Sequence, residues 1–183
     1  MPEVRPFDSP ADYERMIDYF HGADDESLAL MGVDRARLPT RADWLERLLP
    51  DLARPFPEKL TYYLAWCSGS DVVGHSNANQ IAFGVRAQIH LHLWTPERRR
   101  SGLGLACFTE SIRRFARDLS LRQIICEPYA ANPGPNRLLE RAGFRFVRRY
   151  RTTPGPLNFE QEVNRWELAC ALATRVDAGT PAA

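Results

Sequence analysis

The feature that most constrains the fold is a change of hydrophobic period between residues 89 and 119. Apolar side chains alternate with polar and aromatic ones over residues 89–94, which predicts a strand with one apolar side. From Leu105 to Leu119 the apolar side chains instead recur every three or four residues, which predicts an amphipathic helix. A loop that contains proline and glycine joins the two. This strand–loop–helix unit favours an α/β fold.

The rest of the chain uses the same two periods. The first sixty residues predict helices separated by proline and glycine, and the second half predicts strands alternating with helices. The predicted helices are 10–21, 40–52, 105–119 and 135–142, and the predicted strands are 60–67, 72–76, 89–94, 121–127, 144–151 and 163–169. This order predicts an α/β sandwich in which helices cover a mixed sheet. We expect one domain over residues 1–175 and a frayed tail over residues 176–183.

Composition narrows the range of partners. The chain has 183 residues, of which 44% are hydrophobic and 26% charged, as in an ordinary globular domain. No apolar run approaches the roughly 20 residues that a membrane helix needs, and the first residues lack the apolar stretch of a secretory signal. We therefore expect a cytoplasmic protein that does not bind membranes. The net charge of +1 gives no general attraction to nucleic acid.

The cysteines and histidines are spaced too widely to predict a metal site. The four cysteines contain no C-x-x-C pair, and the four histidines do not approach them at the spacing that zinc sites use. Buried, reduced thiols are the simpler interpretation. We expect no metal.

The loop before the predicted helix carries the pattern that most suggests chemistry. Its sequence is Arg99-Arg100-Ser101-Gly102-Leu103-Gly104. The glycines let the backbone approach a bulky anion, and the first turn of the helix supplies N–H groups and the positive end of its dipole. With the two arginines, these features predict a loop that binds pyrophosphate. The alternative is a tight turn with solvated arginines, since the segment lacks both the G-x-G-x-x-G fingerprint and the P-loop pattern.

The same residues resemble the R/Q-x-x-G-x-G/A signature of the GCN5-related N-acetyltransferases, the GNAT superfamily. The order of the flanking elements agrees with that family, and Asn132 to Gly143 matches its N-(x)10-G-F spacing. The resemblance covers residues 60–168. The segment from Glu127 to Asn136 looks most like the branch of ribosomal-protein, siderophore and aminoglycoside acetyltransferases. The resemblance implies a mixed, mostly antiparallel sheet with splayed central strands and helices on both faces.

The resemblance also implies how acetyl-CoA, the expected co-substrate, would bind. The strand end at Leu93 and Trp94 would pair with the pantetheine arm, and the diphosphate would lie on the N–H groups of the loop and the first helical turn. Asn132 and Asn136 would contact the cofactor, or else cap a helix and stabilise a turn. The expected cofactor-binding residues are Leu93, Trp94, Arg99, Arg100, Ser101, Gly102, Leu103, Gly104, Leu105, Asn132 and Asn136.

Acetyl transfer to an amine needs a group that removes a proton. Glu127 is the first candidate, because it ends a strand where the family's cleft opens and burial would raise its basicity; an ion-paired carboxylate is the alternative. His92 is the second, because an unperturbed histidine titrates near neutral pH, although strand histidines are more often simply packed. Leu139 stands where many family members have a tyrosine that protonates the leaving thiolate. Tyr129 is a candidate replacement, and Tyr150 is a weaker one.

The resemblance implies an acetyl-CoA-dependent N-acetyltransferase that acts on a primary amine by direct attack. The expected mechanism has no acyl-enzyme; a cysteine intermediate is the alternative, although Cys126 lies on the strand face opposite Glu127. The acceptor would be a small molecule or a peptide N-terminus, chosen by loops at 76–88 and 154–162, and a homodimer stays open. The alternatives are a non-catalytic acyl-CoA-binding or regulatory module, which Leu139 supports, and transfer to oxygen or of a longer acyl chain.

The charge distribution leaves the acceptor undecided. Residues 1–60 carry 8 Lys and Arg against 13 Asp and Glu, whereas residues 61–183 carry 16 against 10. The acidic half would suit a polyamine or an aminoglycoside, because these helices border the acceptor cleft in the family. An arginine run on the strand at 144–151 would instead attract an acidic substrate or the CoA phosphate. The alternative interpretation of the acidic half and of the arginine run is an ordinary solvated surface.

Overall fold

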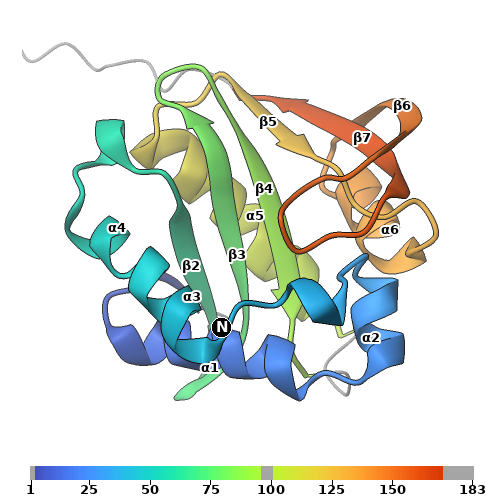
Figure 1. Ribbon diagram of the computed structural model, residues 1–183. Coiled ribbons are helices and arrows are strands. Elements are labelled where there is room, and N and C mark those ends of the chain that lie inside the picture. The colour runs from blue at the N-terminus through green and yellow to red at the C-terminus, as the bar shows by residue number, and fades with distance from the viewer. Residues whose placement is uncertain (1–2, 96–100, 171–183) are drawn as a thin grey trace, which may run out of the picture.

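Seven strands form one sheet in the computed structural model, which describes residues 3–95 and 101–170. The strands are β1 (Glu3–Pro6), β2 (Tyr62–Ser68), β3 (Asp71–Ala82), β4 (Arg86–Leu93), β5 (Gln123–Cys126), β6 (Arg145–Thr152) and β7 (Gln161–Ala169). They lie in the order β1-β2-β3-β4-β5-β7-β6 (Figure 1). Within the described residues β4 and β5 are parallel, and the other neighbouring strands are antiparallel.

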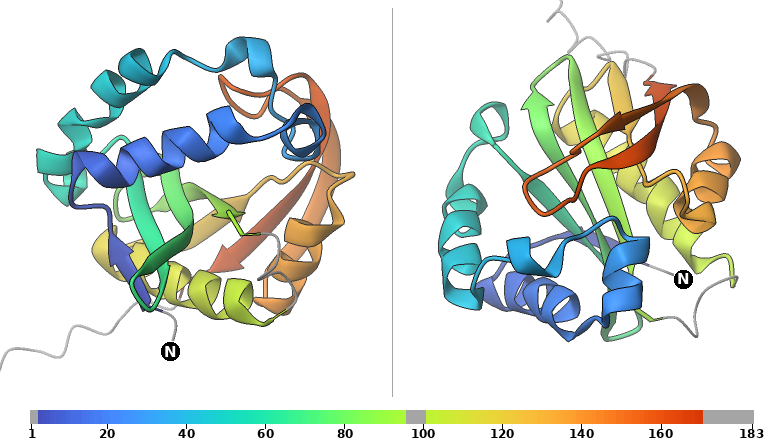
Figure 2. Two further views of the ribbon diagram at one scale, coloured as in Figure 1. Left: turned by 90° about the horizontal axis from the view of Figure 1, so that it is seen from below. Right: turned by 45° about the vertical axis from the view of Figure 1, so that its right-hand side comes forward.

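Helices cover both faces of this sheet (Figure 2). They are α1 (Pro10–Gly22), α2 (Asp25–Leu30), α3 (Arg41–Leu48), α4 (Pro50–Ala53), α5 (Leu103–Asp118) and α6 (Pro133–Arg141), with 3-10 turns η1 (Arg35–Arg37) and η2 (Phe56–Glu58). On the face covered by α5 and α6, Trp66, Ile89 and Phe108 join one apolar core. On the face covered by α1 and α3, Ile17 and Tyr63 join a second core. We call these the α5 face and the α1 face. The mixed, mostly antiparallel sheet with helices on both sides is confirmed.

The chain alternates between the two faces as the strand pattern predicts. Ile89, Leu91 and Leu93 of β4 pack in the α5-face core, whereas His92 contacts the ring of Phe20 from α1 at a centroid distance of 5.1 Å. Because successive strand residues point to opposite faces, the apolar side of β4 supports α5. Its polar side is turned toward α1.

Several element bounds differ from the sequence predictions. β1 and α2 were not predicted, because each is too short to show a period. Residues 76–88, predicted as a loop, belong mostly to β3 and β4, which meet in a hairpin turn around Gly84. α5 begins at Leu103, two residues earlier than predicted. None of the described helices is long and apolar enough to cross a membrane.

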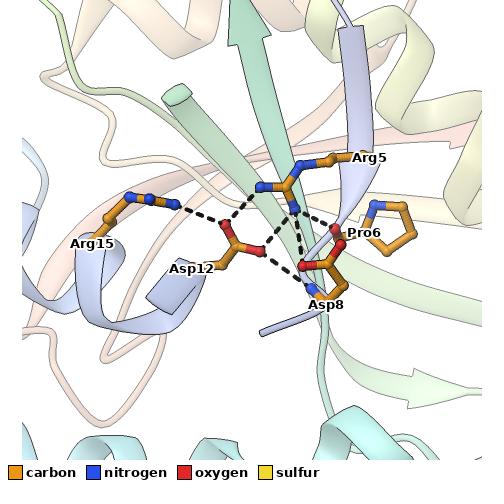
Figure 3. A network of polar contacts seen from close by, with 5 residues as sticks. All are labelled: Arg5, Pro6, Asp8, Asp12 and Arg15. Carbon is orange, nitrogen blue, oxygen red and sulfur yellow. Dashed lines mark hydrogen bonds and ion pairs between the residues drawn. The ribbon is translucent and has the colours of Figure 1, made fainter. Parts of the chain in front are cut away.

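A charged network ties β1 to α1 (Figure 3). Asp12 is buried and accepts two hydrogen bonds of 2.8 Å from Arg5 and one of 3.2 Å from the Asp8 N–H. Arg15 adds a donor 3.3 Å from Oδ1. Burial opposes ionisation of Asp12, but the hydrogen bonds from Arg5 and Asp8 outweigh it and lower the pKa of this carboxyl. We call Arg5, Asp8, Asp12 and Arg15 the N-terminal clamp.

Candidate active site

The parallel strands β4 and β5 part near the middle of the sheet. Their pairing ends at Gln88 and Ile125, whereas β4 continues to Leu93. Figure 1 shows the two strands diverging beyond the paired segment. The far half of β4 therefore has backbone groups on this edge that β5 does not pair, and these can bind an extended ligand. The splayed central strands predicted from the resemblance are confirmed.

α5 begins directly after a glycine in the left-handed conformation. Gly102 has φ +86°, and among the described residues no heavy atom outside its chain neighbours lies within 4 Å of the place a Cβ would take. The N–H groups of Leu103, Gly104 and Leu105 belong to the first helical turn, where backbone donors have no carbonyl of a preceding turn. Open space beside a helix N-terminus fits a diphosphate.

The described part of the predicted loop begins at Ser101. Ser101 and Gly102 are exposed at the start of α5, and the Leu103 N–H lies 3.4 Å from Ser101 Oγ. Arg99 and Arg100 lie outside the described residues. Within the described residues, the predicted anion site thus consists of main-chain donors and a glycine beside which there is room for an anion.

The end of β4 is held by aromatic contacts on the α1 face. The Trp94 N–H donates to the Val73 carbonyl at 2.8 Å, and Trp94 Nε1 donates to His75 Nδ1 at 2.9 Å. The Trp94 ring stacks on Tyr19 of α1 at a centroid distance of 5.8 Å. Leu93 points the other way, into the α5-face core. Both residues therefore fix the course of the strand edge along which pantetheine was predicted to lie.

Three strand histidines on the α1 face are kept uncharged. The rings of His75 and His92 stack at 4.9 Å with an interplanar angle of 10°, and His90 Nε2 lies 3.3 Å from Asn79 Oδ1. Burial lowers the pKa of His90 to about 4 and that of His92 to about 3, and it places the pKa of His75 well below its ordinary value. His92 is therefore neutral at pH 7. This differs from the sequence-based expectation that it titrates near neutral pH.

Glu127 follows the last residue of β5 and joins side chains from two further strands. Its Oε1 accepts a 2.6 Å hydrogen bond from the Tyr150 hydroxyl and a 3.0 Å hydrogen bond from Arg165 Nη1. Arg165 also donates from Nε to Glu167 Oε1 at 2.8 Å. The Glu127 side chain is only 7% exposed. We call Glu127, Tyr150 and Arg165 the Glu127 cluster.

The Glu127 carboxylate is ion-paired, as the alternative interpretation proposed. It also lies at the end of β5 beside the parting strands, where the base was expected. Sequence reasoning did not identify Arg165, whose position 38 residues away gave no local signal. The sequence presents Tyr150 only as a weak candidate for the proton donor missing at Leu139, not as a partner of Glu127. Burial and the hydrogen bond to Glu127 raise the pKa of Tyr150, so its hydroxyl keeps its proton at pH 7.

Asn132 and Asn136 are occupied by contacts within the protein. Asn132 caps α6 by accepting from the Gly134 N–H at 3.1 Å, and its amide donates to the Leu30 carbonyl at 2.9 Å. Asn136 Oδ1 accepts from Asn164 and Trp166, and its Nδ2 donates to two main-chain carbonyls. These contacts agree with the capping and turn roles named as alternatives. Those of Asn136 hold α6 against β7, and that of Asn132 ties the start of α6 to α2.

Tyr129 lies beyond the Glu127 cluster. It is opposite Val163 in an isolated β-bridge, and its ring contacts Phe159 edge-on at 5.9 Å. It lines a cavity of about 310 Å³ together with Arg149, Arg151 and other residues of the β6–β7 hairpin. None of its described contacts joins it to the Glu127 cluster.

Two further positions bear on the chemistry. Leu139 is fully buried in the α5-face core, so this position contributes no polar group. Cys126 is buried in the same core, and burial raises the pKa of its thiol well above the ordinary value. The thiol is thus protonated and turned away from Glu127. Within the described residues no three His, Cys, Asp or Glu side chains could hold a metal ion together.

Comparison with known proteins finds similarity in three dimensions only. No family model matches the sequence, and no curated protein matches it. Among solved structures, a ribosomal-protein alpha-N-acetyltransferase, RimL, in complex with coenzyme A is 12% identical, with a TM-score of 0.72 over 92% of this chain and 93% of that one. A spermidine N-acetyltransferase from Vibrio cholerae is 12% identical, with a TM-score of 0.69 over 92% and 93%. An aminoglycoside acetyltransferase in complex with coenzyme A is 15% identical, with a TM-score of 0.68 over 92% and 95%.

These structures share one fold with the chain over nearly its whole length. That fold is the GNAT fold, as the resemblance to that superfamily implied. The similarity includes the N-terminal helices, which the sequence alone matched only in a general way. At identities of 12–15% it establishes architecture, while the chemistry has to be argued from this chain's own residues.

Proposed function

We propose that the protein is an acetyl-CoA-dependent N-acetyltransferase, formed by a single domain over residues 1–175, that moves an acetyl group to a primary amine by direct attack. The observation that carries the proposal is the start of α5. There Gly102, at φ +86°, leaves open space beside the first N–H groups of a 16-residue helix. A bulky, doubly charged anion such as a diphosphate is the ligand that this arrangement suits.

The parting of β4 from β5 supports the same proposal. Acetyl-CoA would supply the acetyl thioester, and its pantetheine arm would lie along the β4 edge beyond Gln88, near Leu93 and Trp94. The N–H groups of Gly102, Leu103, Gly104 and Leu105 would hold the diphosphate, together with Ser101, Arg99 and Arg100. Asn132 and Asn136 would support this site by fixing α6 rather than by direct contact.

Glu127 is the best supported base. Both hydrogen bonds described for its carboxylate fall on Oε1, so Oε2 is left to accept a proton from the acceptor amine. As the N–C bond forms and the C–S bond breaks, the amine proton passes to Glu127 and the sulfur leaves with CoA as a thiolate. His92 is a poorer base, because its pKa is about 3 and its ring is stacked on His75.

No tyrosine replaces Leu139 as a proton donor in this proposal. Tyr150 donates its proton to Glu127, which orients the carboxylate, and Tyr129 contacts Phe159 instead. The thiolate would therefore leave without a dedicated acid. The proposal is direct transfer, because Cys126 is a protonated, buried thiol that offers no nucleophile.

The decisive experiment combines binding with turnover. Free thiol release from acetyl-CoA is measured with a panel of amines, and CoA affinity is measured by calorimetry for the wild type, Gly102→Glu and Gly84→Glu. Gly84 is a matched control, because it also has positive φ and open space beside it, and its N–H donates to Leu119 beyond the C-terminal end of α5. Gly102→Glu should weaken CoA binding about 100-fold or more through like-charge repulsion, whereas Gly84→Glu should not.

Two outcomes would contradict the proposal. Equal CoA affinity of the two glycine variants would remove the anion site from the start of α5. CoA binding without thiol release for any amine would instead favour a binding module.

A further inference from the structure

The α1 face of the sheet continues past Glu127 as a row of charged side chains on β7 and β6. Arg165 of β7 lies opposite Arg148 of β6 in the antiparallel register, so both side chains point to the same face. Arg165 already contacts two carboxylates, Glu127 at 3.0 Å and Glu167 at 2.8 Å. Its charge is balanced within the protein.

Arg148 differs in having no such partner. No carboxylate of the described residues lies within 4 Å of its guanidinium, and its contact in the structure is the ring of Tyr150, whose centroid is 4.6 Å from Cζ. Because Arg165 is already neutralised by its two carboxylates, the exposed guanidinium of Arg148 is the one of this pair that is available to bind an added anion.

The position of Arg148 relates it to the Glu127 cluster. Its guanidinium packs on the face of the Tyr150 ring, and the hydroxyl of that ring donates to Glu127 Oε1 at 2.6 Å. A single tyrosine ring thus separates an unpaired guanidinium from the carboxylate proposed as the base. A guanidinium binds carboxylates well, because two of its N–H groups can donate to both carboxylate oxygens at once.

The other arginines near the end of β6 serve the opposite face. Arg149 donates to Asn164, which is bound to Asn136 of α6, and Arg151 pairs with Glu160 at 3.0 Å. Arg151 therefore carries the same charge on the same strand, but it is already paired and points away from the Glu127 cluster. This difference makes it a matched control for Arg148.

We propose that the acceptor is an amine that also carries a carboxylate close to its amino group, as an amino acid does, and that Arg148 binds this carboxylate while Glu127 accepts the amine proton. The inference rests on the proposed function and names its substrate class. It distinguishes the protein from the acetyltransferases of spermidine and aminoglycosides that share its fold, because an unpaired arginine beside the base repels polycations.

The test uses acceptor sets that differ in the carboxylate alone: an α-amino acid, its amide and the amine left by decarboxylation, with aromatic and aliphatic side chains. For the wild type, kcat/KM should be about tenfold or more higher for the acid. Arg148→Gln should abolish this preference mainly by raising KM for the acid, and kcat/KM should fall much less for the decarboxylated amine than for the acid. Arg151→Gln should retain the preference.

Binding of products separates this inference from the proposed function. N-acetyl amino acids and the matching N-acetyl amines are titrated into wild type, Arg148→Gln and Arg151→Gln by calorimetry, which needs no turnover. Arg148-dependent binding of the acids supports the inference even if no acceptor releases thiol. Equal binding of the N-acetyl amino acids and the N-acetyl amines overturns the inference. Turnover that favours spermidine or an aminoglycoside over every amino acid also overturns it. Turnover of simple amines with no carboxylate preference overturns the inference and leaves the proposed function standing.

Discussion

Asp12 and Glu127 are both buried carboxylates held by an arginine, but their oxygens are used differently. In the N-terminal clamp, Oδ1 of Asp12 receives Arg5 and Arg15, and Oδ2 receives Arg5 and the Asp8 N–H. In the Glu127 cluster, both described donors approach Oε1, and Arg165 divides its donors between Glu127 and Glu167. The first carboxylate is saturated with donors, whereas the second keeps one oxygen for another partner.

This difference separates a structural carboxylate from one suited to chemistry. A carboxylate that accepts four hydrogen bonds is held in its charged form and gains nothing from a further ligand. It stabilises the junction of β1 and α1, which are otherwise joined by three residues of loop. A carboxylate with one oxygen unused, at the end of β5 beside the parting strands, can take a proton without first breaking a contact. Burial alone would not have distinguished the two.

The largest expected effect is on folding, from Asp12→Ala. Removing this buried carboxylate leaves the half-buried Arg5 with only Asp8, at 3.6 Å, as a partner, and breaking a buried pair costs about 3–5 kcal/mol. Urea unfolding measures the loss. Asp18→Ala is the control, because its pair with Arg41 has both side chains largely exposed and should contribute less than about 1 kcal/mol. If Asp12→Ala lowers the free energy of unfolding no more than Asp18→Ala is expected to, by less than about 1 kcal/mol, the clamp does not stabilise the fold.

Glu127→Gln should affect catalysis far more than folding. The amide can still accept from Tyr150 and Arg165, so the free energy of unfolding should fall by about 1 kcal/mol or less, but kcat should fall about 100-fold as the base is lost. Glu162→Gln, an exposed carboxylate on β7, should leave kcat unchanged. An unchanged kcat for Glu127→Gln would mean that another group removes the amine proton.

The contrast between these two carboxylates also marks how far the sequence could predict the molecule. Local patterns were sufficient where neighbours in the chain decide the structure. The stripe over residues 105–119 predicted α5, the alternation over residues 89–94 predicted which side of β4 is apolar, and the spacing of Gly102 and Gly104 predicted the turn before the helix. Each depends on backbone geometry within a few residues.

Contacts between distant residues left no such pattern. Glu127 meets Tyr150 and Arg165 only because β5, β7 and β6 lie side by side, and this order differs from their order in the chain. A single sequence therefore could present Glu127 as a candidate base but could not identify its partners. The same limit applies to His92, whose neutrality follows from burial against α1 and stacking on His75, neither of which its strand encodes locally.

The smallest effect, a difference in acid sensitivity, sharpens the comparison. The pKa of His90 is about 4 in the folded protein, lowered by burial and opposed in part by Glu127, against about 6.5 in the unfolded chain. Its contribution to stability is fully present above pH 6.5 and is lost as the pH falls toward 4, because only the unfolded state binds the proton. The pKa of Asp12 is lowered, so the clamp contributes above about pH 3.9 and weakens only below it.

Between pH 6.5 and 5.5, His90 should therefore account for about 1 kcal/mol of the loss in unfolding free energy. His90→Gln should lack this part of the loss. Asp12→Asn should lose as much unfolding free energy over this pH interval as the wild type. Urea unfolding at the two pH values measures both, and a loss in His90→Gln equal to that of the wild type would show that His90 is not held neutral by the fold.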